Sequence, residues 1–294
     1  MNRRGAHVYW TRPGRPDERP FADFEALTVA VSCLMWRAFN GPITLYTDRG
    51  GIAHLAQMTL LPFWDEIDTA VLQQVPDDVQ ADVFWDLGKA VTLAALPSGS
   101  CVLDLDLIVW QRLDLAADAL GFLHWERPVR PWYLGPRDLK TPPGYTFDPV
   151  IDWDAPVCNT AFTTAGDPEF GNRYATEALR FARRNRPDHA GLGEFLFAGQ
   201  RLFAHLGRRH GARMDPLVEY VFDPEVPDGN GDDPLALHAC EAGIPFTHLW
   251  RNKWPLLRDI AAADRFRNWL IQRCVGLAPQ FEHRRAELEA IRGA

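Results

Sequence analysis

Two aspartates interrupt an apolar run of the sequence, "CVLDLDLIVW", which extends from Cys101 to Trp110. The run predicts a buried strand, in which a carboxylate is costly unless a partner balances its charge. Side chains two residues apart in an extended strand point to the same side, about 7 Å from one another. The spacing therefore predicts that Asp104 and Asp106 face one way and repel each other unless a cation lies beside them.

A divalent cation would satisfy this pair. Mg²⁺ and Mn²⁺ prefer oxygen ligands, and they often combine a few protein carboxylates with phosphate oxygens of a substrate. The functional interpretation is a metal–diphosphate site at the end of a strand. The structural alternative is an aspartate pair satisfied by backbone amides or by a nearby arginine.

The elements around this run predict an α/β protein. Strands and helices alternate up to residue 110, which favours a mostly parallel central sheet with a ligand crevice at the carboxyl ends of its strands. Predicted strands cover 7–10, 42–48, 67–72, 101–110, 159–165 and 218–222. Predicted helices cover 22–39 (with Asp23 as a possible cap), 51–58, 80–96, 168–184, 191–206, 257–274 and 280–292. Residues 124–156 are irregular and rich in Pro, Trp and Gly, and long irregular segments are often functional.

Composition excludes several classes. The chain has 294 residues, with 31 basic and 39 acidic side chains and a net charge of −8, so no basic footprint indicates a nucleic-acid partner. Five cysteines without close spacing favour a reducing compartment over a disulfide framework or zinc knuckle. No apolar stretch follows Arg3 and Arg4 as in a signal peptide, and no run of 18 apolar residues predicts a transmembrane segment. We expect a soluble cytoplasmic protein, of an oligomeric state that the sequence does not indicate.

The order "FWDLGKAVTLAAL…GSCVLDLDLIVWQRLDL" resembles the core of GT-A glycosyltransferases, in which a helix carrying a lysine precedes a strand that ends in the Asp-x-Asp (DxD) motif. It is most similar to the retaining glycogenin-like and galactosyltransferase-like members (the family 8/32 type). "YWTRP" stands where the first strand meets the nucleotide, and "LYTD" ends the second strand. "CNTAFTTA" resembles the Asn-centred strand beside the donor sugar, and "HLWRNKW" (248–254) resembles the C-terminal His…Lys-Pro-Trp motif.

The resemblance implies a GT-A (Rossmann-like) α/β fold with one catalytic domain over 1–294. Its nucleotide-binding half would cover about 1–123, and its acceptor half about 124–294. The implied activity is hexosyltransferase-like transfer, with retention, from a nucleotide-sugar to a sugar, lipid or protein acceptor. The implied cofactor is Mn²⁺ or Mg²⁺, and a UDP-sugar is expected in preference to a GDP-sugar.

The resemblance also implies roles for charged residues. Asp106 would bind the metal, Asp104 would share it or hold the ribose, and His248 would be a third ligand. Lys89 and Lys253 would reach the diphosphate as point charges. The structural alternatives are a solvated helix lysine at position 89 and an ordinary loop histidine at position 248.

Further residues would contact the donor. Asn159 could bond sugar hydroxyls or merely cap a turn, and Glu194 or Gln200 could assist the reaction at the sugar. Contacts to base and ribose are expected from Trp10, Thr11 and Asp48. Tryptophans at 125, 132 and 153 lie in the irregular segment, where they could pack in the core or form a platform for sugar rings.

Two departures keep other functions open. "HLWRNKW" lacks the family's Gly between His and Lys and its Pro before Trp, and the Asp-Gln dipeptide common near the acceptor is missing. One alternative is a haloacid-dehalogenase-type phosphatase, whose Asp-x-Asp motif lies near the N-terminus and precedes a small pair, where this chain has Leu107 and Ile108. The other is a non-catalytic carbohydrate- or nucleotide-binding protein on the same fold.

Overall fold

A seven-stranded sheet forms the centre of the computed structural model, which describes residues 3–12, 20–187, 192–226 and 233–294. The strand order is β10-β6-β9-β4-β1-β2-β3. Only β9 runs antiparallel to its neighbours, β4 and β6, and the other pairings are parallel. The strands are β1 (Gly5–Tyr9), β2 (Ile43–Thr47), β3 (Glu66–Asp68), β4 (Cys101–Leu103), β6 (Leu120–Phe122), β9 (Phe162–Thr164) and β10 (Met214–Pro216). The predicted α/β class with a mostly parallel sheet is confirmed.

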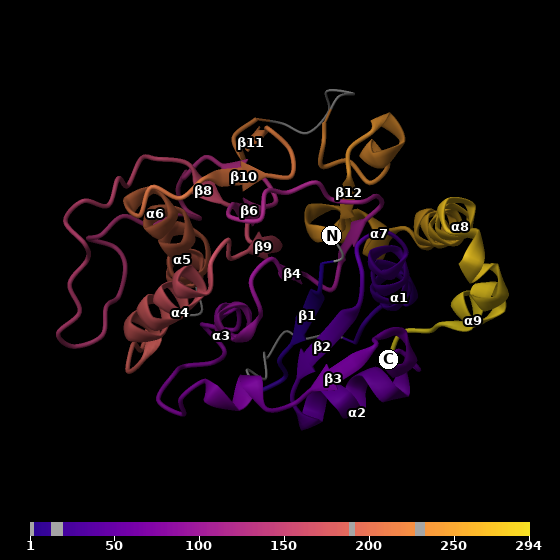
Figure 1. Ribbon diagram of the computed structural model, residues 1–294, viewed down its shortest axis with the longest axis horizontal. Coiled ribbons are helices and arrows are strands. Elements are labelled where there is room, and N and C mark those ends of the chain that lie inside the picture. Colours follow the sequence, from indigo (N-terminus) through magenta and orange to yellow (C-terminus); the bar gives the residue numbers. More distant parts are fainter. Residues whose placement is uncertain (1–2, 13–19, 188–191, 227–232) are drawn as a thin grey trace.

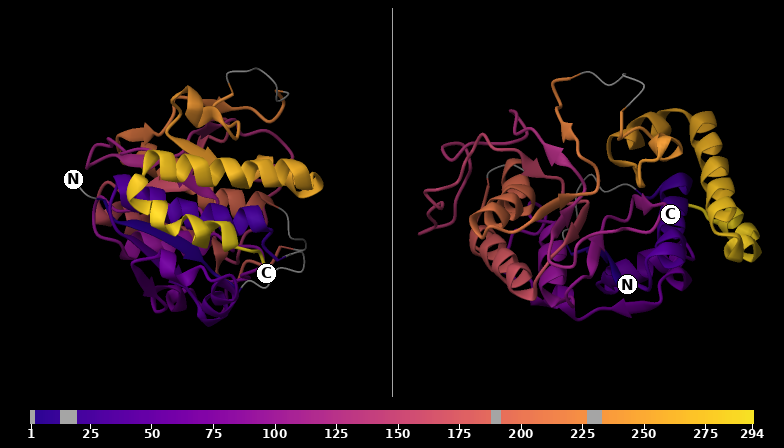
Figure 2. Two further views of the ribbon diagram at one scale, coloured as in Figure 1. Left: turned by 90° about the vertical axis from the view of Figure 1, so that its right-hand side faces the viewer. Right: turned by 45° about the horizontal axis from the view of Figure 1, so that its top comes forward.

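Helices cover both faces of the sheet (Figure 1). On one side lie α3 (Leu87–Ala95), α4 (Pro168–Ala182), α5 (Leu192–Leu196) and α6 (Leu202–Arg209). On the other side lie α1 (Asp23–Phe39), α7 (Lys253–Arg258), α8 (Ile260–Leu277) and α9 (Arg285–Ala290), while α2 (Arg49–Gln57) lies near β3. Figure 2 shows α8 and α9 on the outside of α1. In the described part of the chain, no helix is long and apolar enough to cross a bilayer.

Shorter elements connect these layers. The short strands are β5 (Leu107–Val109), β7 (Trp125–Glu126), β8 (Val157–Cys158), β11 (Val221–Phe222) and β12 (Phe246–His248). Short 3₁₀ helices occur at Leu61–Phe63, Val71–Gln74, Ala239–Ala242, Trp250–Asn252 and Pro279–Arg284, and a π-helical turn occurs at Phe197–Arg201. The five short strands form two smaller sheets, β11-β7-β8 and β12-β5, which are separate from the main sheet.

Successive side chains of the buried strands point into two different cores. In β4, Cys101 and Leu103 join the cluster under α1 and α8, while Val102 joins the cluster under α3 and α4. Such strands, buried on both faces, read as continuous apolar runs, which is why the sequence shows them so clearly. All five cysteines are buried and carry free thiols.

The predicted strand 101–110 is wrong in one respect that bears on the site. β4 ends at Leu103, and the chain turns through Asp104 and Asp106 before β5 begins. The Leu107 amide donates to the Asp104 carbonyl at 3.1 Å, and β5 pairs antiparallel with β12 rather than continuing the main sheet. A carboxylate within the sheet's apolar layers would lack any partner, so the chain leaves the sheet where the carboxylates begin.

Three predicted helical features also differ. The helix predicted from residue 80 begins at Leu87, and acidic side chains at Asp82 and Asp86 precede its start, where a helix dipole favours them. The helix predicted over 191–206 contains the π-helical turn. Asp23 does not cap α1: Ala22 is the N-cap, and its amide donates to the Glu25 carboxylate at 2.9 Å.

His7 of β1, an interior strand of the main sheet, is buried in a hydrogen-bonded network. Its Nδ1 accepts from Trp64 Nε1 at 3.1 Å, so Nε2 carries the proton and donates to Ser32 Oγ at 3.1 Å. Ser32 Oγ in turn donates to the Leu107 carbonyl at 2.5 Å. Burial lowers the pKa of His7 to about 3, against a small opposing effect of Asp106.

This shift predicts an acid-sensitive stability. The folded state keeps His7 neutral while the unfolded chain binds a proton near pH 6.5, so the contribution is complete above pH 6.5 and is lost as the pH falls towards 3. Between pH 7.5 and pH 5, the free energy of unfolding should fall by about 2 kcal/mol more in the wild type than in His7→Gln. Urea unfolding at both pH values measures this, and equal losses in the two proteins would contradict it.

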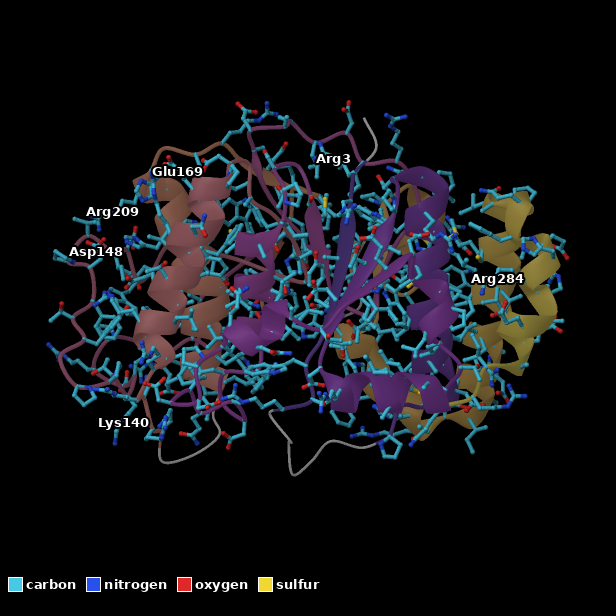
Figure 3. All side chains as sticks on the ribbon, turned by 60° about the horizontal axis from the view of Figure 1, so that its bottom comes forward. Arg3, Lys140, Asp148, Glu169, Arg209 and Arg284 are labelled. Carbon is cyan, nitrogen blue, oxygen red and sulfur yellow. The ribbon has the colours of Figure 1, made fainter. Side chains whose placement is uncertain are left out.

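Several ion pairs lie at the periphery. Asp148 and Arg209 meet at the outer edge of the α4–α6 side, where Glu169 also lies, while Arg284 lies on the opposite side beside α9 (Figure 3). Exposed pairs of this kind add little to stability, typically under about 1 kcal/mol. Because these pairs lie far from the cavity described below, Asp148 and Glu169 are suitable positions for control substitutions.

Candidate active site

A cavity of about 940 Å³ opens at the carboxyl ends of β1 and β4. Trp10 follows β1, Asp104 and Asp106 follow β4, Asn159 precedes β9, and His248 ends β12. Open α/β sheets bind their ligands at this end of the strands. The cavity is therefore where the predicted site was expected, and it brings together residues from both halves of the chain.

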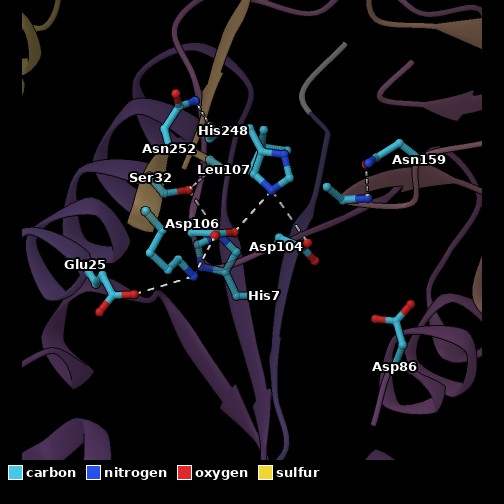
Figure 4. A network of polar contacts seen from close by, with 12 residues as sticks. His7, Glu25, Ser32, Asp86, Asp104, Asp106, Leu107, Asn159, His248 and Asn252 are labelled. Carbon is cyan, nitrogen blue, oxygen red and sulfur yellow. Dashed lines mark hydrogen bonds and ion pairs between the residues drawn. The ribbon is translucent and has the colours of Figure 1, made fainter. Parts of the chain in front are cut away.

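Three possible metal ligands converge on its floor (Figure 4). One ligand atom from each of Asp104, Asp106 and His248 lies within 4.8 Å of the other two. His248 Nε2 is 3.4 Å from Asp106 Oδ1 and 3.9 Å from Asp104 Oδ2. The turn at residues 104–106 and the pairing of β5 with β12 together produce this convergence, which a straight strand would not give.

Each of the two aspartates uses one carboxylate oxygen to pair with a lysine. Asp104 pairs through Oδ1 with Lys89, which also contacts Asp86 at 2.7 Å, and Asp104 turns Oδ2 towards His248. Asp106 pairs through Oδ2 with Lys253 at 3.1 Å and turns Oδ1 towards His248. Each carboxylate thus keeps one oxygen directed at the imidazole, and three ligand atoms face the same point.

The cluster has the charge that a divalent cation would offset. Lys253 also lies 3.5 Å from Glu25, so four carboxylates and two ammonium groups meet here, and their net formal charge is −2. Burial opposes the charged form of Asp106, but Lys253 and His248 outweigh it and lower its pKa. Burial raises the pKa of Asp104 despite the opposing charge of Lys89. Carboxylates with such opposed shifts in one cleft are typical of functional sites.

Rigid elements hold the ligands in place. The Leu249 amide donates to the Asp106 carbonyl at 3.1 Å, and Ser32 holds the Leu107 carbonyl from α1. His248 is buried, and its Nδ1 has no hydrogen-bond partner among the described residues. The two carboxylates of the cluster approach its other ring nitrogen, Nε2.

A second polar group lies across the cavity. Glu126 is buried at the end of β7, where it accepts hydrogen bonds from Tyr133 Oη and Asn159 Nδ2, both at 2.5 Å. The Gln200 amide contacts the same tyrosine hydroxyl. Burial raises the pKa of Glu126, and the two donated hydrogen bonds oppose that shift.

The structure brings most of the predicted site residues to this cavity. Its lining includes Trp10, Lys89, Asp104, Asp106, Asn159, Gln200, His248 and Lys253. The π-helical turn carries Gln200 to the cavity, and such turns are frequent at functional sites. The Lys89 ammonium group, predicted to reach a diphosphate, contacts the carboxylates of Asp86 and Asp104 in this structure.

Three predicted residues lie elsewhere in the described structure. Asp48 is the N-cap of α2, where it accepts from the Gly51 amide at 2.8 Å, and it also accepts from the Thr11 amide at 2.9 Å. Glu194 is 1% exposed and accepts from the Lys140 amide at 2.9 Å. None of Thr11, Asp48 and Glu194 is among the described residues that line the cavity.

Three further carboxylates of the cavity, Glu126, Asp86 and Glu25, were not predicted from the sequence. Glu126 follows the mostly apolar stretch 119–125, but it lacks the paired spacing that singled out Asp104 and Asp106. Of the three tryptophans singled out, Trp132 lines the cavity. Trp125 packs against Phe122, and Trp153 stacks on Phe197 with ring centroids 5.7 Å apart.

Comparisons with known proteins give distant structural neighbours. No protein-family model and no curated protein matches the sequence. Among solved structures, the chain is similar to the PaToxG glycosyltransferase, with 11% identity, 71% of this chain and 70% of that chain covered, and a TM-score of 0.42. It is also similar to mouse xyloside xylosyltransferase 1 in its apo form, with 14% identity, 84% and 97% coverage, and a TM-score of 0.38. The α/β class itself follows from the strand order of the sheet.

Proposed function

We propose that the protein is a metal-dependent glycosyltransferase that moves a sugar from a nucleotide-sugar, preferably a UDP-sugar, to an acceptor hydroxyl with retention. One observation carries the proposal. Two carboxylate oxygens and one imidazole nitrogen face a single point in a cavity of about 940 Å³, with a lysine on each side. Donors of this kind suit Mn²⁺ or Mg²⁺ bound together with a diphosphate.

The residues present fit a divalent cation. Asp104, Asp106 and His248 would hold it, with His248 binding through Nε2, the nitrogen that faces the two carboxylates. A bound cation supplies charge stabilisation for the leaving diphosphate. Lys253 and Lys89 add positive charge on either side, so the diphosphate would lie against the same edge of the cavity.

Glu126, Asn159 and Gln200 would face the donor sugar. In the proposed transfer, the bond between the anomeric carbon and the diphosphate oxygen breaks, and its electron pair stays on the diphosphate. The acceptor oxygen bonds to the anomeric carbon, and the acceptor proton passes to the diphosphate. The Glu126 carboxylate, fixed by Tyr133 and Asn159, would stabilise the positive charge that develops at the anomeric carbon.

Glu126→Gln should therefore lower kcat by about 10²–10³-fold, because it removes a preorganised charge while conserving side-chain shape. Steady-state transfer measures the effect. Glu169→Gln is the matched control, since Glu169 is exposed and pairs with Arg173 on α4, and its kcat should stay at the wild-type value. Equal kcat values for Glu126→Gln and the control would contradict the role of Glu126.

The proposed activity is tested with a panel of UDP- and GDP-sugars in the presence of Mn²⁺ or Mg²⁺. Release of nucleoside diphosphate is followed by phosphorus NMR, and the anomeric configuration of the product by proton NMR. Metal-dependent release with retained configuration supports the proposal. Nucleotide binding without release would indicate the non-catalytic binding protein instead, and release of inorganic phosphate would indicate the phosphatase.

A further inference from the structure

The mouth of the cavity differs in chemistry from its floor. Among the described lining residues, the four most exposed are Trp132, Leu192, Val226 and Trp254, with 46%, 38%, 59% and 60% exposure. All four are apolar or aromatic. The acidic and basic lining residues are half-buried or buried, and most are held in the ion pairs of the floor.

Apolar surface continues inward from this mouth. On one side, Phe195 lines the cavity three residues after Leu192 and stacks on Trp85, with ring centroids 4.1 Å apart. On the other side, Phe222 packs edge-on against Trp250 at 5.0 Å, and Trp250 is stacked over the His248 ring at 6.1 Å. Each wall thus leads from the mouth to the polar floor.

Two polar groups of the cavity lining are already engaged. The Arg251 guanidinium is held by Asp233, and the Tyr133 hydroxyl is held by Glu126. The side chains of Leu192 and Val226 offer no hydrogen-bond donor or acceptor, and Trp132 and Trp254 each add a flat ring with a single indole donor. A sugar acceptor needs hydrogen bonds for its several hydroxyl groups, whereas an apolar body is stabilised by the removal of its surface from water.

We propose that the acceptor is a small apolar alcohol, in which the reacting hydroxyl is carried by an aromatic or aliphatic body that lies between these walls. The proposal rests on the proposed transferase function. The acceptor oxygen forms a bond to the anomeric carbon, the carbon–diphosphate bond breaks, and the hydroxyl proton passes to the diphosphate. The walls exclude water around the apolar body and aim its hydroxyl at the floor, which limits donor hydrolysis.

The test compares 2-phenylethanol and 1-octanol with methyl glucoside as acceptors for the donor identified in the panel. The value of kcat/KM should be at least about tenfold higher for the two apolar alcohols. Leu192→Asn should lower the ratio of transfer to donor hydrolysis about fivefold with these alcohols. The control is Leu277→Asn, which alters an equally exposed leucine on α8, outside the cavity, and should behave as the wild type.

Calorimetric binding of 2-phenylethanol in the presence of nucleotide and metal provides a readout without turnover, and Leu192→Asn should weaken this binding. A preference for methyl glucoside, or equal effects of the two leucine substitutions, would overturn the acceptor proposal while leaving the transferase function standing. Failure to bind or cleave any nucleotide-sugar would instead overturn the proposed function, and the acceptor proposal with it.

Discussion

Asp106→Asn is expected to reduce glycosyl transfer by at least about 10³-fold while the protein remains folded. Asp106 directs one oxygen at His248 and gives the other to Lys253, so the amide would remove one proposed metal ligand and the partner of a lysine at once. Loss of a preorganised group that stabilises the leaving charge typically costs 10²–10³ in kcat, and loss of the cation adds to it. Initial rates at saturating donor and Mn²⁺ measure the effect.

Asp148→Asn is the matched control for this prediction. Asp148 also accepts from a histidine, at 3.0 Å from His205 Nε2, and also pairs with a cation, Arg209, but it lies at the outer edge of the molecule (Figure 3). The same chemical change there should leave the rate within about twofold of wild type. Activity of Asp106→Asn within tenfold of the control would contradict the assignment of Asp106.

Lys89→Met is expected to destabilise the metal-free protein by about 3–5 kcal/mol. Lys89 is the cation between Asp86 and Asp104, and methionine would leave two largely buried carboxylates without it. Removing one partner from a buried ion pair strands the other charge, and the penalty is of this size. Burial alone would lower the pKa of Lys89, but Asp104 and Asp86 raise it. The two carboxylates therefore stabilise the charged lysine.

Urea unfolding in the presence of EDTA measures this loss. Lys140→Met, at an exposed lysine outside the cavity, should change stability by less than about 0.5 kcal/mol. The double variant Asp86→Asn/Lys89→Met should recover part of the loss, because one of the stranded charges is gone. Stability of Lys89→Met within 1 kcal/mol of the control would show that the three side chains do not act as a charged unit.

Alternating apolar and helical segments predicted the fold, because strands buried on both faces leave continuous apolar runs that need no knowledge of their partners. The same reasoning made 101–110 a single strand. Beyond the two aspartates, β5 leaves the main sheet and pairs instead with β12, which lies 137 residues further along the chain. A single sequence does not indicate such a pairing. The two aspartates were therefore predicted correctly as neighbours, but in an extended strand rather than in the turn where they lie.

The prediction of the site is limited in the same way, because contacts between distant segments of the chain do not show in a single sequence. Asp104 and Asp106 stand out because two carboxylates at fixed spacing repeat a signal, whereas Glu126 is a lone acid whose partners, Tyr133 and Asn159, become neighbours only in the fold. Glu194 was a candidate because the resembled families use an acidic or amide side chain near the donor sugar, but its carboxylate accepts from the backbone amide of Lys140. Asp48 has a local reason for its place, since an aspartate before a helix caps its first turn.

The central claim is that Asp104, Asp106 and His248 hold a divalent cation together with a nucleoside diphosphate. Calorimetric titration of UDP into the protein, with Mn²⁺ and then with EDTA, tests it most directly. The account predicts that UDP binds at least about tenfold more tightly with Mn²⁺ and that Asp106→Asn abolishes this difference. Equal UDP affinity with Mn²⁺ and with EDTA, or no binding of UDP or GDP at millimolar concentration, would contradict it.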